Sequence, residues 1–143
     1  MISITKIFHF EMAHAIYGYP GACSNIHGHS YELHVSVTAA TLTDEYIPST
    51  GILFDFKELK KAVKESVINI FDHQLVLSEK YIHSKDVNPD TENLYVFDTE
   101  PSAENLLVFI RNKLEMVFPP EIRLVCLKLY ETKESYATWT NYM

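Results

Sequence analysis

Three histidines occupy positions from which they can bind one metal ion. His27 and His29 are separated by Gly28, and His14 ends an earlier segment with strand periodicity. Side chains two residues apart on a strand project from the same face. Three neutral imidazoles that leave a fourth position open are the pattern of a catalytic zinc site. Isolated histidines are also common as hydrogen-bonded surface or core residues, so the spacing alone leaves both interpretations open.

Cys23 lies four residues before His27 and is a candidate for chemistry at the same place. It can be a fourth metal ligand, which would close the site, or a base or nucleophile beside the metal. An inert loop thiol is the third interpretation. The dipeptide Asp72-His73 places a carboxylate next to an imidazole, a pair that can tune a general base reaching Cys23. The same dipeptide is also typical of a helix C-terminus.

Two glutamates are candidates for contacts in a pocket. Glu131 shares the strand side of Leu127 and Leu129, so its carboxylate stands at the end of an apolar row. A buried acid is costly without a partner, which can be an internal arginine, a backbone donor, or a ligand whose N–H groups reach both oxygens. Glu104, near the start of a predicted helix, is most simply a carboxylate that interacts favourably with the helix dipole.

Alternating residues predict strands that position the histidines. Even positions of the first segment are largely apolar, and a loop rich in Gly, Pro, Ser and Asn follows at residues 17–25. A turn at Lys133 and Glu134 separates the last two strands. The predicted strands are residues 2–14, a segment that begins near His27, residues 122–132 and residues 134–143.

Two helices are predicted between these strands. The first begins at the N-cap Asp55, forms a capping box with Glu58 and ends near Phe71. Its apolar stripe consists of Phe56, Leu59, Val63, Val67 and Ile70. The second begins after the N-cap Ser102 and ends before Pro119. Its apolar stripe consists of Ala103, Leu106, Ile110, Leu114 and Val117.

The order of the elements is strand, strand, helix, helix, strand, strand. It predicts an α+β fold with two helices on one face of a four-stranded antiparallel sheet. Residues 78–101 have weak periodicity and are long for a plain connection, so this insert is functional, flexible or in contact with a partner. Open sheet edges that carry aromatic residues are a pairing hazard, which favours closure into an oligomer.

Length, composition and charge limit the classes of protein to which the chain can belong. At 143 residues the chain is most simply one domain, residues 1–143, with 47% hydrophobic and 22% charged residues. The formal charge of −7 argues against non-specific binding to nucleic acid. No apolar run approaches a membrane span and the first residues lack a signal-peptide pattern, so we expect a cytoplasmic protein with no membrane partner. Two cysteines argue against a disulfide framework.

Taken together, the motifs resemble those of the 6-pyruvoyltetrahydropterin synthase and 6-carboxytetrahydropterin synthase family. The resemblance covers nearly the whole chain, and each motif alone is modest, but six in the same order and approximate spacing are highly specific. The matching motifs are His14, then Cys23-Ser-Asn-Ile-His27-Gly-His29, Gly51-Ile-Leu-Phe-Asp55-Phe, Asp72-His73, Ser102-Ala-Glu104-Asn105 and Glu131-Thr132.

This resemblance implies a tunnelling fold. In that fold each subunit adds a four-stranded antiparallel sheet to an oligomeric barrel, commonly a homo-hexamer built as a dimer of trimers. Such a barrel would close the sheet edges that the sequence leaves open. The resemblance also implies that His14, His27 and His29 bind Zn²⁺ as the resident cofactor.

Roles for the remaining candidates follow from the same resemblance. It implies that Cys23, Asp72 and His73 form a catalytic triad assembled across a subunit boundary. It also implies that Glu131 anchors the pterin ring of the substrate. Glu104 is a supporting residue of the pocket in that comparison.

The implied activity is that of a zinc-dependent lyase acting on 7,8-dihydroneopterin triphosphate. One branch cleaves the side chain and forms 6-carboxy-5,6,7,8-tetrahydropterin with release of acetaldehyde and triphosphate, a step of queuosine and other deazapurine synthesis. The other branch eliminates triphosphate and keeps the side chain. The three residues between Cys23 and His27 resemble the bacterial carboxy-forming branch, since the animal branch has a longer insert there. We therefore predict the carboxy-forming enzyme, with 6-pyruvoyltetrahydropterin synthase as the alternative.

Two features depart from the family pattern, and two other function classes compete. Ala103 stands where many relatives have threonine, and the insert at residues 78–101 is longer than in compact bacterial members. A non-catalytic pterin-binding assembly protein would need only Glu131 and the barrel. Zinc-dependent hydrolysis would give Cys23 no role. The presence of the complete triad favours the lyase over both.

Overall fold

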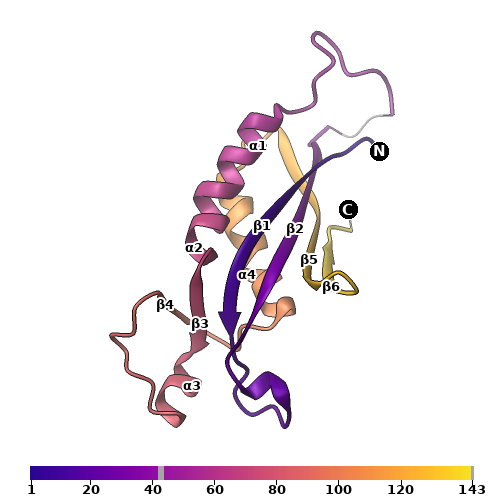
Figure 1. Cartoon of the computed structure of the whole chain (residues 1–143). Helices are drawn as coiled ribbons and strands as arrows, with labels where there is room; N and C mark the ends of the chain where they lie inside the picture. The colour runs from indigo at the N-terminus through magenta and orange to yellow at the C-terminus, as the bar shows by residue number, and fades with distance from the viewer. Residues whose placement is uncertain (42–43, 143) are drawn as a thin grey trace.

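The computed structural model describes residues 1–41 and 44–142 of the chain. Its centre is a six-stranded mixed sheet in the order β4-β3-β1-β2-β5-β6 (Figure 1). Strands β1, β2, β5 and β6 pair antiparallel with one another in that order, whereas β3 pairs parallel with both β1 and β4. The strands are β1 (Ile4–His14), β2 (His27–Ala39), β3 (Gln74–Ser78), β4 (Leu94–Phe97), β5 (Ile122–Thr132) and β6 (Ser135–Thr140).

The prediction of a four-stranded, wholly antiparallel sheet is wrong, although the four predicted strands are present and antiparallel to one another. The two further strands, β3 and β4, are five and four residues long. Runs this short carry little periodicity. The pairing of β3 with β1, and of β4 with β3, therefore decides their conformation. The insert at residues 78–101 therefore has structure of its own, namely β4 and the helix α3 (Glu79–Ser84), which Ser78 caps.

Burial along β1 and β2 follows the predicted alternation. One face of the pair is buried, and the exposed residues between alternate onto the other face. The register places Phe10 opposite Tyr31, and their rings stack with centroids 5.0 Å apart. The same register places His14 opposite His27 at the end of the pair. The buried side chains of the two strands are Phe8, Phe10, Met12, His14, Tyr31, Leu33, Val35 and Val37.

The first predicted helix forms as three consecutive pieces: α1 (Phe56–Val63), a π-helical turn η2 (Lys64–Ile68) and α2 (Asn69–Phe71). Asp55 caps α1 by accepting a hydrogen bond from the backbone N–H of Lys57. The wider π turn rotates the phase of the buried stripe. Ile68 and Phe71 therefore point into the core. Phe56, predicted to be buried, is 51% exposed in the first turn of α1, which precedes the π turn.

The second predicted helix is α4 (Ala103–Val117). Its N-cap Ser102 accepts a hydrogen bond from the backbone N–H of Asn105, as the sequence predicts. The stripe from Ala103 to Leu114 is buried and includes Leu107, while Val117 is exposed. Burial of each large apolar side chain contributes about 1.5–3 kcal/mol. The cap fixes the start of α4 close to the end of β1, where the histidines lie.

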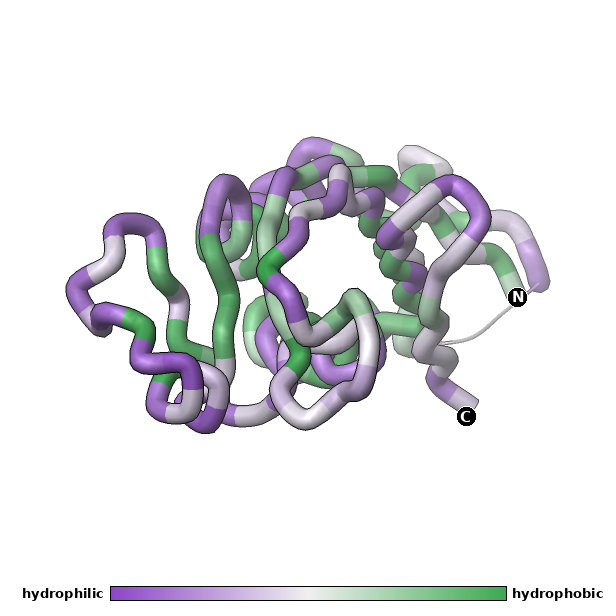
Figure 2. The backbone as a smooth tube through the Cα atoms, turned by 60° about the horizontal axis from the view of Figure 1, so that its bottom comes forward, coloured by the Kyte–Doolittle hydropathy of each residue, from purple (hydrophilic) through white to green (hydrophobic). Residues whose placement is uncertain are grey.

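The helices α1 and α4 cover one face of the sheet and enclose the main core (Figures 1 and 2). A smaller cluster of Ala15, Leu77 and Tyr81 lies under α3. In Figure 2 the α3–β4 connection, which projects from the body of the molecule, is mostly hydrophilic. None of the helices in the described part of the chain is long and apolar enough to cross a membrane.

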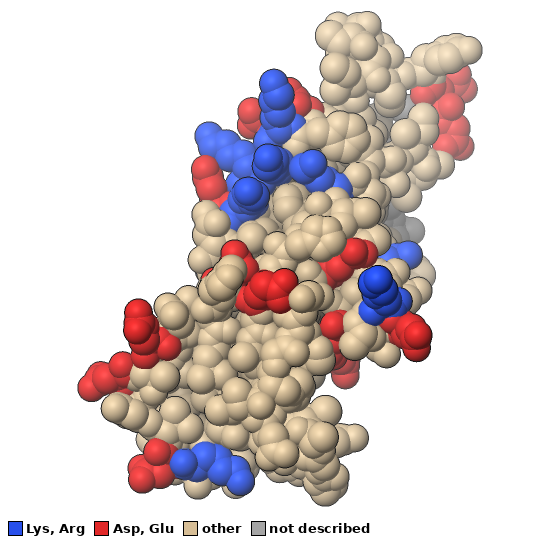
Figure 3. Space-filling view, viewed as in Figure 1, with Lys and Arg blue, Asp and Glu red and all other residues tan. Residues whose placement is uncertain are grey.

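Positive charge is concentrated on α1, although the chain carries a formal charge of −7. Figure 3 shows the lysine side chains gathered over this helix, at the end of the molecule away from the β1–β2 connection. Helical spacing places the four lysines of this region on one outward face. They are Lys57, Lys60, Lys61 and Lys64.

Candidate metal centre and active site

The three predicted histidines meet at the end of the β1–β2 pair. His14 and His27 face each other across the two strands, and His29 lies two residues further on the same face of β2. The ligand nitrogens of the three rings lie within 4.8 Å of one another. Antiparallel register therefore assembles residues that are 13 or more positions apart in the chain. Among the described residues, this is the group of histidine, cysteine or acidic side chains close enough to hold one ion.

Two backbone carbonyls fix the orientation of the rings. The Pro101 oxygen lies 2.7 Å from Nδ1 of His14, and the Asn25 oxygen lies 2.7 Å from Nδ1 of His27. Because a carbonyl oxygen only accepts, Nδ1 of each neutral ring carries the hydrogen and Nε2 carries the lone pair. The two Nε2 atoms are 3.1 Å apart. Two lone pairs at this distance repel each other unless a cation lies between them, so the arrangement fits a metal ion.

His29 gives independent evidence that the three histidines fit a metal ion. Its Nε2 is the buried side-chain polar atom that has no hydrogen-bond partner within residues 1–41 and 44–142. Glu131 Oε2 approaches it to 3.0 Å, an ion-pair distance without the geometry of a hydrogen bond. An unpartnered buried nitrogen is costly. A metal ion at the centre of the three rings would satisfy it.

Burial keeps the imidazoles in the form that binds metals. It lowers the pKa of His14 and that of His29 below the ordinary histidine value. For His14, the hydrogen bond to Pro101 and the negative charge of Glu131 act in the opposite direction but do not reverse the shift. A lowered pKa means that the ring is neutral at pH 7, and a neutral imidazole is a ligand without first losing a proton.

Glu131 completes the cluster from a neighbouring strand. It is the extra residue of a β-bulge between Tyr130 and Thr132, next to the β5–β6 turn. Bulges re-aim side chains and are common beside active sites. The carboxylate is 29% exposed and lies 3.0 Å from His29 Nε2 and 3.6 Å from His14 Nε2. The groups that the structure places next to this carboxylate are therefore the two imidazoles.

Two cavities adjoin the cluster on the sheet. One, of about 580 Å³, is lined by His29, Glu131 and Lys133 together with residues of β1 and β2. The other, of about 520 Å³, is lined by His29, Glu11 and His73. His29 thus borders both spaces. The first brings an acceptor carboxylate, a metal-ligand candidate and a lysine to one place.

Cys23 lies apart from the metal ligands. It belongs to the short helix η1 (Ala22–Ser24) in the β1–β2 connection and is exposed and free. Its backbone oxygen accepts a hydrogen bond from the backbone N–H of Ile16. The side chain of Glu100 accepts one from the backbone N–H of Tyr17. These two bonds fix the start of the connection. The group of mutually close ligand atoms does not include Cys23. Its role as a fourth ligand is therefore not supported, whereas a role as a base beside the site is compatible with this position.

Asp72 and His73 form a pair on the other side of β1. Nδ1 of His73 lies 3.0 Å from Oδ1 of Asp72, and the imidazole side chain is 76% exposed. Both residues bind the backbone of Glu11, since its N–H donates to Asp72 and its carbonyl accepts from the His73 N–H. His73 has a φ of 64°, which is uncommon for a residue other than glycine. The backbone bonds to β1 hold it in this conformation.

No hydrogen bond or ion pair within the described chain joins Cys23 to Asp72 or His73. Figure 1 shows the β1–β2 connection at the lower end of the sheet, whereas β3 begins beside the middle of the molecule. The fold brings the histidines and Glu131 together in one chain. It does not bring the complete predicted triad together in one chain.

The sequence profile described as 6-pyruvoyl tetrahydropterin synthase matches residues 3–141. The chain belongs to this family. Its fold agrees with the solved structure of 6-pyruvoyl tetrahydropterin synthase from Caenorhabditis elegans at a TM-score of 0.69, with 22% sequence identity, over 99% of this chain and 96% of that one.

Curated relatives of the 6-pyruvoyl tetrahydropterin synthase family carry two different names. The 6-carboxy-5,6,7,8-tetrahydropterin synthase of Rickettsia typhi is 30% identical over 140 residues, which cover 95% of this chain and 98% of the relative. The human 6-pyruvoyl tetrahydrobiopterin synthase is 29% identical over 119 residues, which cover 83% of this chain and 70% of the relative. Both are similar to this chain, and they differ in how completely they align.

Other predicted and unpredicted residues complete the site of this family member. Glu104 lies exposed in the first turn of α4, and its pocket role stays a prediction. Pro101 and Asn25 orient the histidines through backbone carbonyls, which leave no signal in the sequence. The sequence pattern places Tyr31 in a strand and gives no sign of a role in the site. In the structure its ring packs edge-on against His29, with centroids 5.4 Å apart. Burial and the charge of Glu131 raise the pKa of this phenol, so it stays protonated.

We expect the purified protein to bind one Zn²⁺ per chain, measured by elemental analysis after gel filtration and by competition with a chromophoric chelator. The variants His27→Ala and His29→Ala should each weaken binding more than about 100-fold, because even outer contacts of a metal ligand are worth up to that factor. His83→Ala, a change at an exposed histidine of α3, is the matched control. Equal zinc affinity in all four proteins would show that the three rings do not form the metal site.

Proposed function

We propose that the chain is a zinc-dependent lyase that converts 7,8-dihydroneopterin triphosphate into 6-carboxy-5,6,7,8-tetrahydropterin, with release of acetaldehyde and triphosphate. The observation that carries the proposal is the convergence of three imidazoles and Glu131 beside a cavity, in a member of this family. The carboxy-forming relative aligns over 98% of its length and the human pyruvoyl-forming one over 70%. This difference supports the carboxy-forming product over the alternative.

His14, His27 and His29 would hold the Zn²⁺. Imidazole nitrogens suit zinc, and three of them leave a position open for a substrate, as in catalytic sites. Bound there, Zn²⁺ would polarise an oxygen of the substrate side chain as a Lewis acid. The Nδ1 bonds to Pro101 and Asn25 would keep Nε2 of the first two rings directed at the metal.

Glu131 and Lys133 would bind the two ends of the substrate. A carboxylate can accept two parallel hydrogen bonds from the N–H groups of a pterin ring edge. Lys133 lines the same cavity and would supply positive charge for the triphosphate, which an acidic chain otherwise lacks near this site. Glu104 is proposed as a supporting residue of the pocket. A place in queuosine synthesis and a cytoplasmic location stay expectations from the sequence.

Cys23 would move protons at the carbons of the substrate side chain. His73, oriented by Asp72, would act as the base that tunes this thiol. The pair is preformed but has no contact with Cys23 of its own chain. We therefore propose that Asp72 and His73 act on the Cys23 of a neighbouring subunit.

The edges of the sheet support such an assembly. Strand β3 pairs with β1 only at Met12, Ala13 and His14, so the edge of residues 4–11 is not covered by β3, and β6 is the outer strand on the other side. Exposed Ile7 on β1 and Tyr136 on β6 add apolar surface to these edges. Pairing of β6 of one copy with β1 of the next would extend the sheet into a barrel. We propose a homo-hexamer of two stacked trimers.

The decisive experiment identifies the product. Incubation of zinc-loaded protein with 7,8-dihydroneopterin triphosphate should release acetaldehyde and triphosphate together, detected by coupled alcohol dehydrogenase and by ion chromatography. The double variant His27→Ala/His29→Ala is the control and should release neither. Release of triphosphate alone would contradict the carboxy-forming assignment and indicate the pyruvoyl-forming branch. If the native protein releases neither acetaldehyde nor triphosphate, the lyase proposal is wrong.

The role of Cys23 is tested against the second cysteine of the chain. Cys23→Ala should lower turnover by about 100- to 10,000-fold, the usual contribution of a general acid–base group. Zinc content should be unchanged, because Cys23 is not among the metal-ligand candidates. Cys126→Ala, on β5, should retain turnover. Unchanged turnover in Cys23→Ala would favour hydrolysis by the metal alone, and loss of zinc would make Cys23 a ligand.

A mixing experiment tests whether the triad spans two subunits. Cys23→Ala chains and His73→Ala chains, each inactive, are unfolded, mixed in equal amounts and refolded together. If a site takes Cys23 from one chain and His73 from another, random mixing gives about a quarter of the sites both native residues. Turnover should then return to about a quarter of the native value. No recovery, with mixed oligomers verified by mass spectrometry, would place the triad within one chain.

A further inference from the structure

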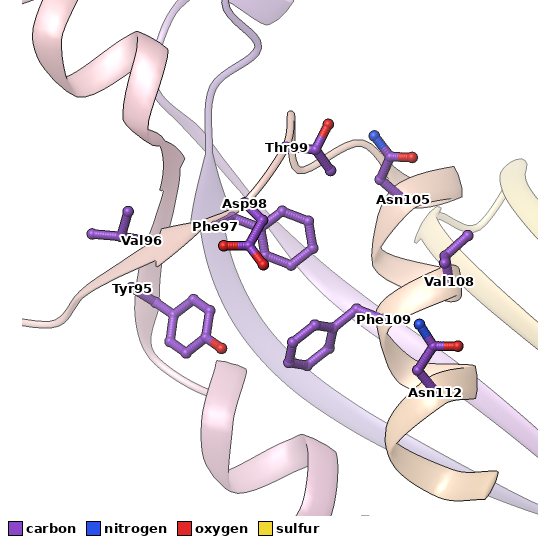
Figure 4. A pocket seen from close by; sticks show the side chains of 9 residues that line it. All are labelled: Tyr95, Val96, Phe97, Asp98, Thr99, Asn105, Val108, Phe109 and Asn112. Carbon is purple, nitrogen blue, oxygen red and sulfur yellow. The ribbon is translucent and has the colours of Figure 1, made fainter.

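A separate cavity lies between β4 and α4, away from the metal centre (Figure 4). Its volume is about 190 Å³. In Figure 4, Tyr95 and Asp98 extend from the β4 side toward Phe109 of α4, with Phe97 behind them. None of the residues assigned above to metal, catalysis or substrate lines it. Its lining includes Tyr95, Phe97, Asp98, Asn105, Phe109 and Asn112, with Val108 at the rim.

The aromatic walls set the shape and size of a ligand. The rings of Phe97 and Phe109 have centroids 5.5 Å apart, and those of Tyr95 and Phe109 meet edge to face at 6.3 Å. These separations leave no room for a ring sandwiched between two walls, so a ligand would lie against one aromatic face. A cavity of about 150 Å³ holds benzene in another protein. The space here therefore admits one substituted ring or a small fused bicycle.

The lining offers unused hydrogen-bond acceptors as well as donors. Asn105 donates its Nδ2 to the Glu100 carbonyl, which leaves its Oδ1 for another partner. Asn112 uses its Oδ1 for Arg111, which leaves its amide N–H groups. No hydrogen bond or ion pair of the Asp98 carboxylate is found among the described residues. The Asp98 carboxylate and the Asn105 oxygen can accept hydrogen bonds from a ligand that brings N–H donors.

The charge of the cavity lining also favours a ligand that donates hydrogen bonds. Asp98 is the charged residue of the lining, which includes no lysine or arginine. A phosphate or carboxylate group would therefore meet a carboxylate and no cation. Lys113, which is not part of the lining, already lies over one face of the Phe109 ring, with the ammonium 5.4 Å from the centroid. The charge of the lining itself, that of Asp98, thus favours a cationic ligand over an anionic one.

We propose that this cavity is a second small-molecule site, for a planar nitrogen heterocycle that carries an amino or protonated ring N–H edge. The edge would bind the Asp98 carboxylate with two parallel hydrogen bonds, as a guanidinium does. The ring would lie on the Phe109 and Phe97 faces. The oxygen of Asn105 would accept a further N–H from the same ligand.

The test uses the assembled, zinc-loaded protein and three probes that share a planar fused bicyclic ring. 2-Aminobenzimidazole is planar and cationic, indole is neutral with one N–H, and indole-2-carboxylate is anionic. Backbone amide NMR shifts during titration report the site that each probe occupies. We expect saturable binding in the order 2-aminobenzimidazole, indole, indole-2-carboxylate, with the largest shifts at Tyr95, Asp98 and Phe109.

Variants separate charge recognition from simple ring burial. Asp98→Asn should weaken 2-aminobenzimidazole about tenfold or more, the usual worth of a hydrogen bond to a charged group, and leave indole nearly unchanged. Asp90→Asn, an acid of the same insert outside the cavity, is the matched control. Val108→Trp adds a side chain at a rim position that is 45% exposed and should block both probes without disturbing the core.

Four results would overturn the proposal. They are no saturable binding of 2-aminobenzimidazole, equal or tighter binding of the anionic probe, unaltered binding to Asp98→Asn, and largest shifts at His27 and His29. The last would place the probe in the metal centre. Because binding is read without turnover, failure here is distinguishable from failure of the lyase activity.

Discussion

The site depends on the register of one antiparallel pair. β1 and β2 place His14 opposite His27, with His29 two residues along the same face. A shift of one residue would send an imidazole to the opposite face of the sheet, since side chains alternate along a strand. The stacked Phe10 and Tyr31 rings, also opposite each other, lie in the buried part of the pair and oppose such a shift. The apolar core thereby fixes the positions of polar groups at its end.

Neighbouring elements then set the chemistry of those groups. The segment that leads into α4 supplies the Pro101 carbonyl to His14, and the β1–β2 connection supplies the Asn25 carbonyl to His27. A bulge in β5 directs Glu131 at the same rings. Burial favours the neutral imidazole while the carboxylate favours the charged one, and burial prevails for His14 and His29. The result is a set of lone pairs that a cation can share.

The catalytic candidates are divided between two regions of the chain. Cys23 lies in an exposed connection, and Asp72 with His73 is fixed to the edge of β1 through Glu11. Because these exposed groups have no mutual contact in one chain, we propose that the sites are shared between subunits. The edges of β1 and β6 that are not paired within the chain are the surfaces proposed for this assembly.

Local sequence patterns determined much of this protein. Alternation predicted the four antiparallel strands, Asp55 and Ser102 marked the helix starts, and the spacing of His27 and His29 indicated a metal site. These features depend on periodicity and on nearest-neighbour hydrogen bonds, which the sequence encodes directly. Only the tertiary structure decided the rest. β3 and β4 are too short to show a pattern, the π turn changes which of the residues after it are buried, and the partners of Glu131 and of the His14 Nδ1 atom are distant in the chain. Contacts of this kind arise because folding closes long loops, and no local residue pattern records which groups will then meet.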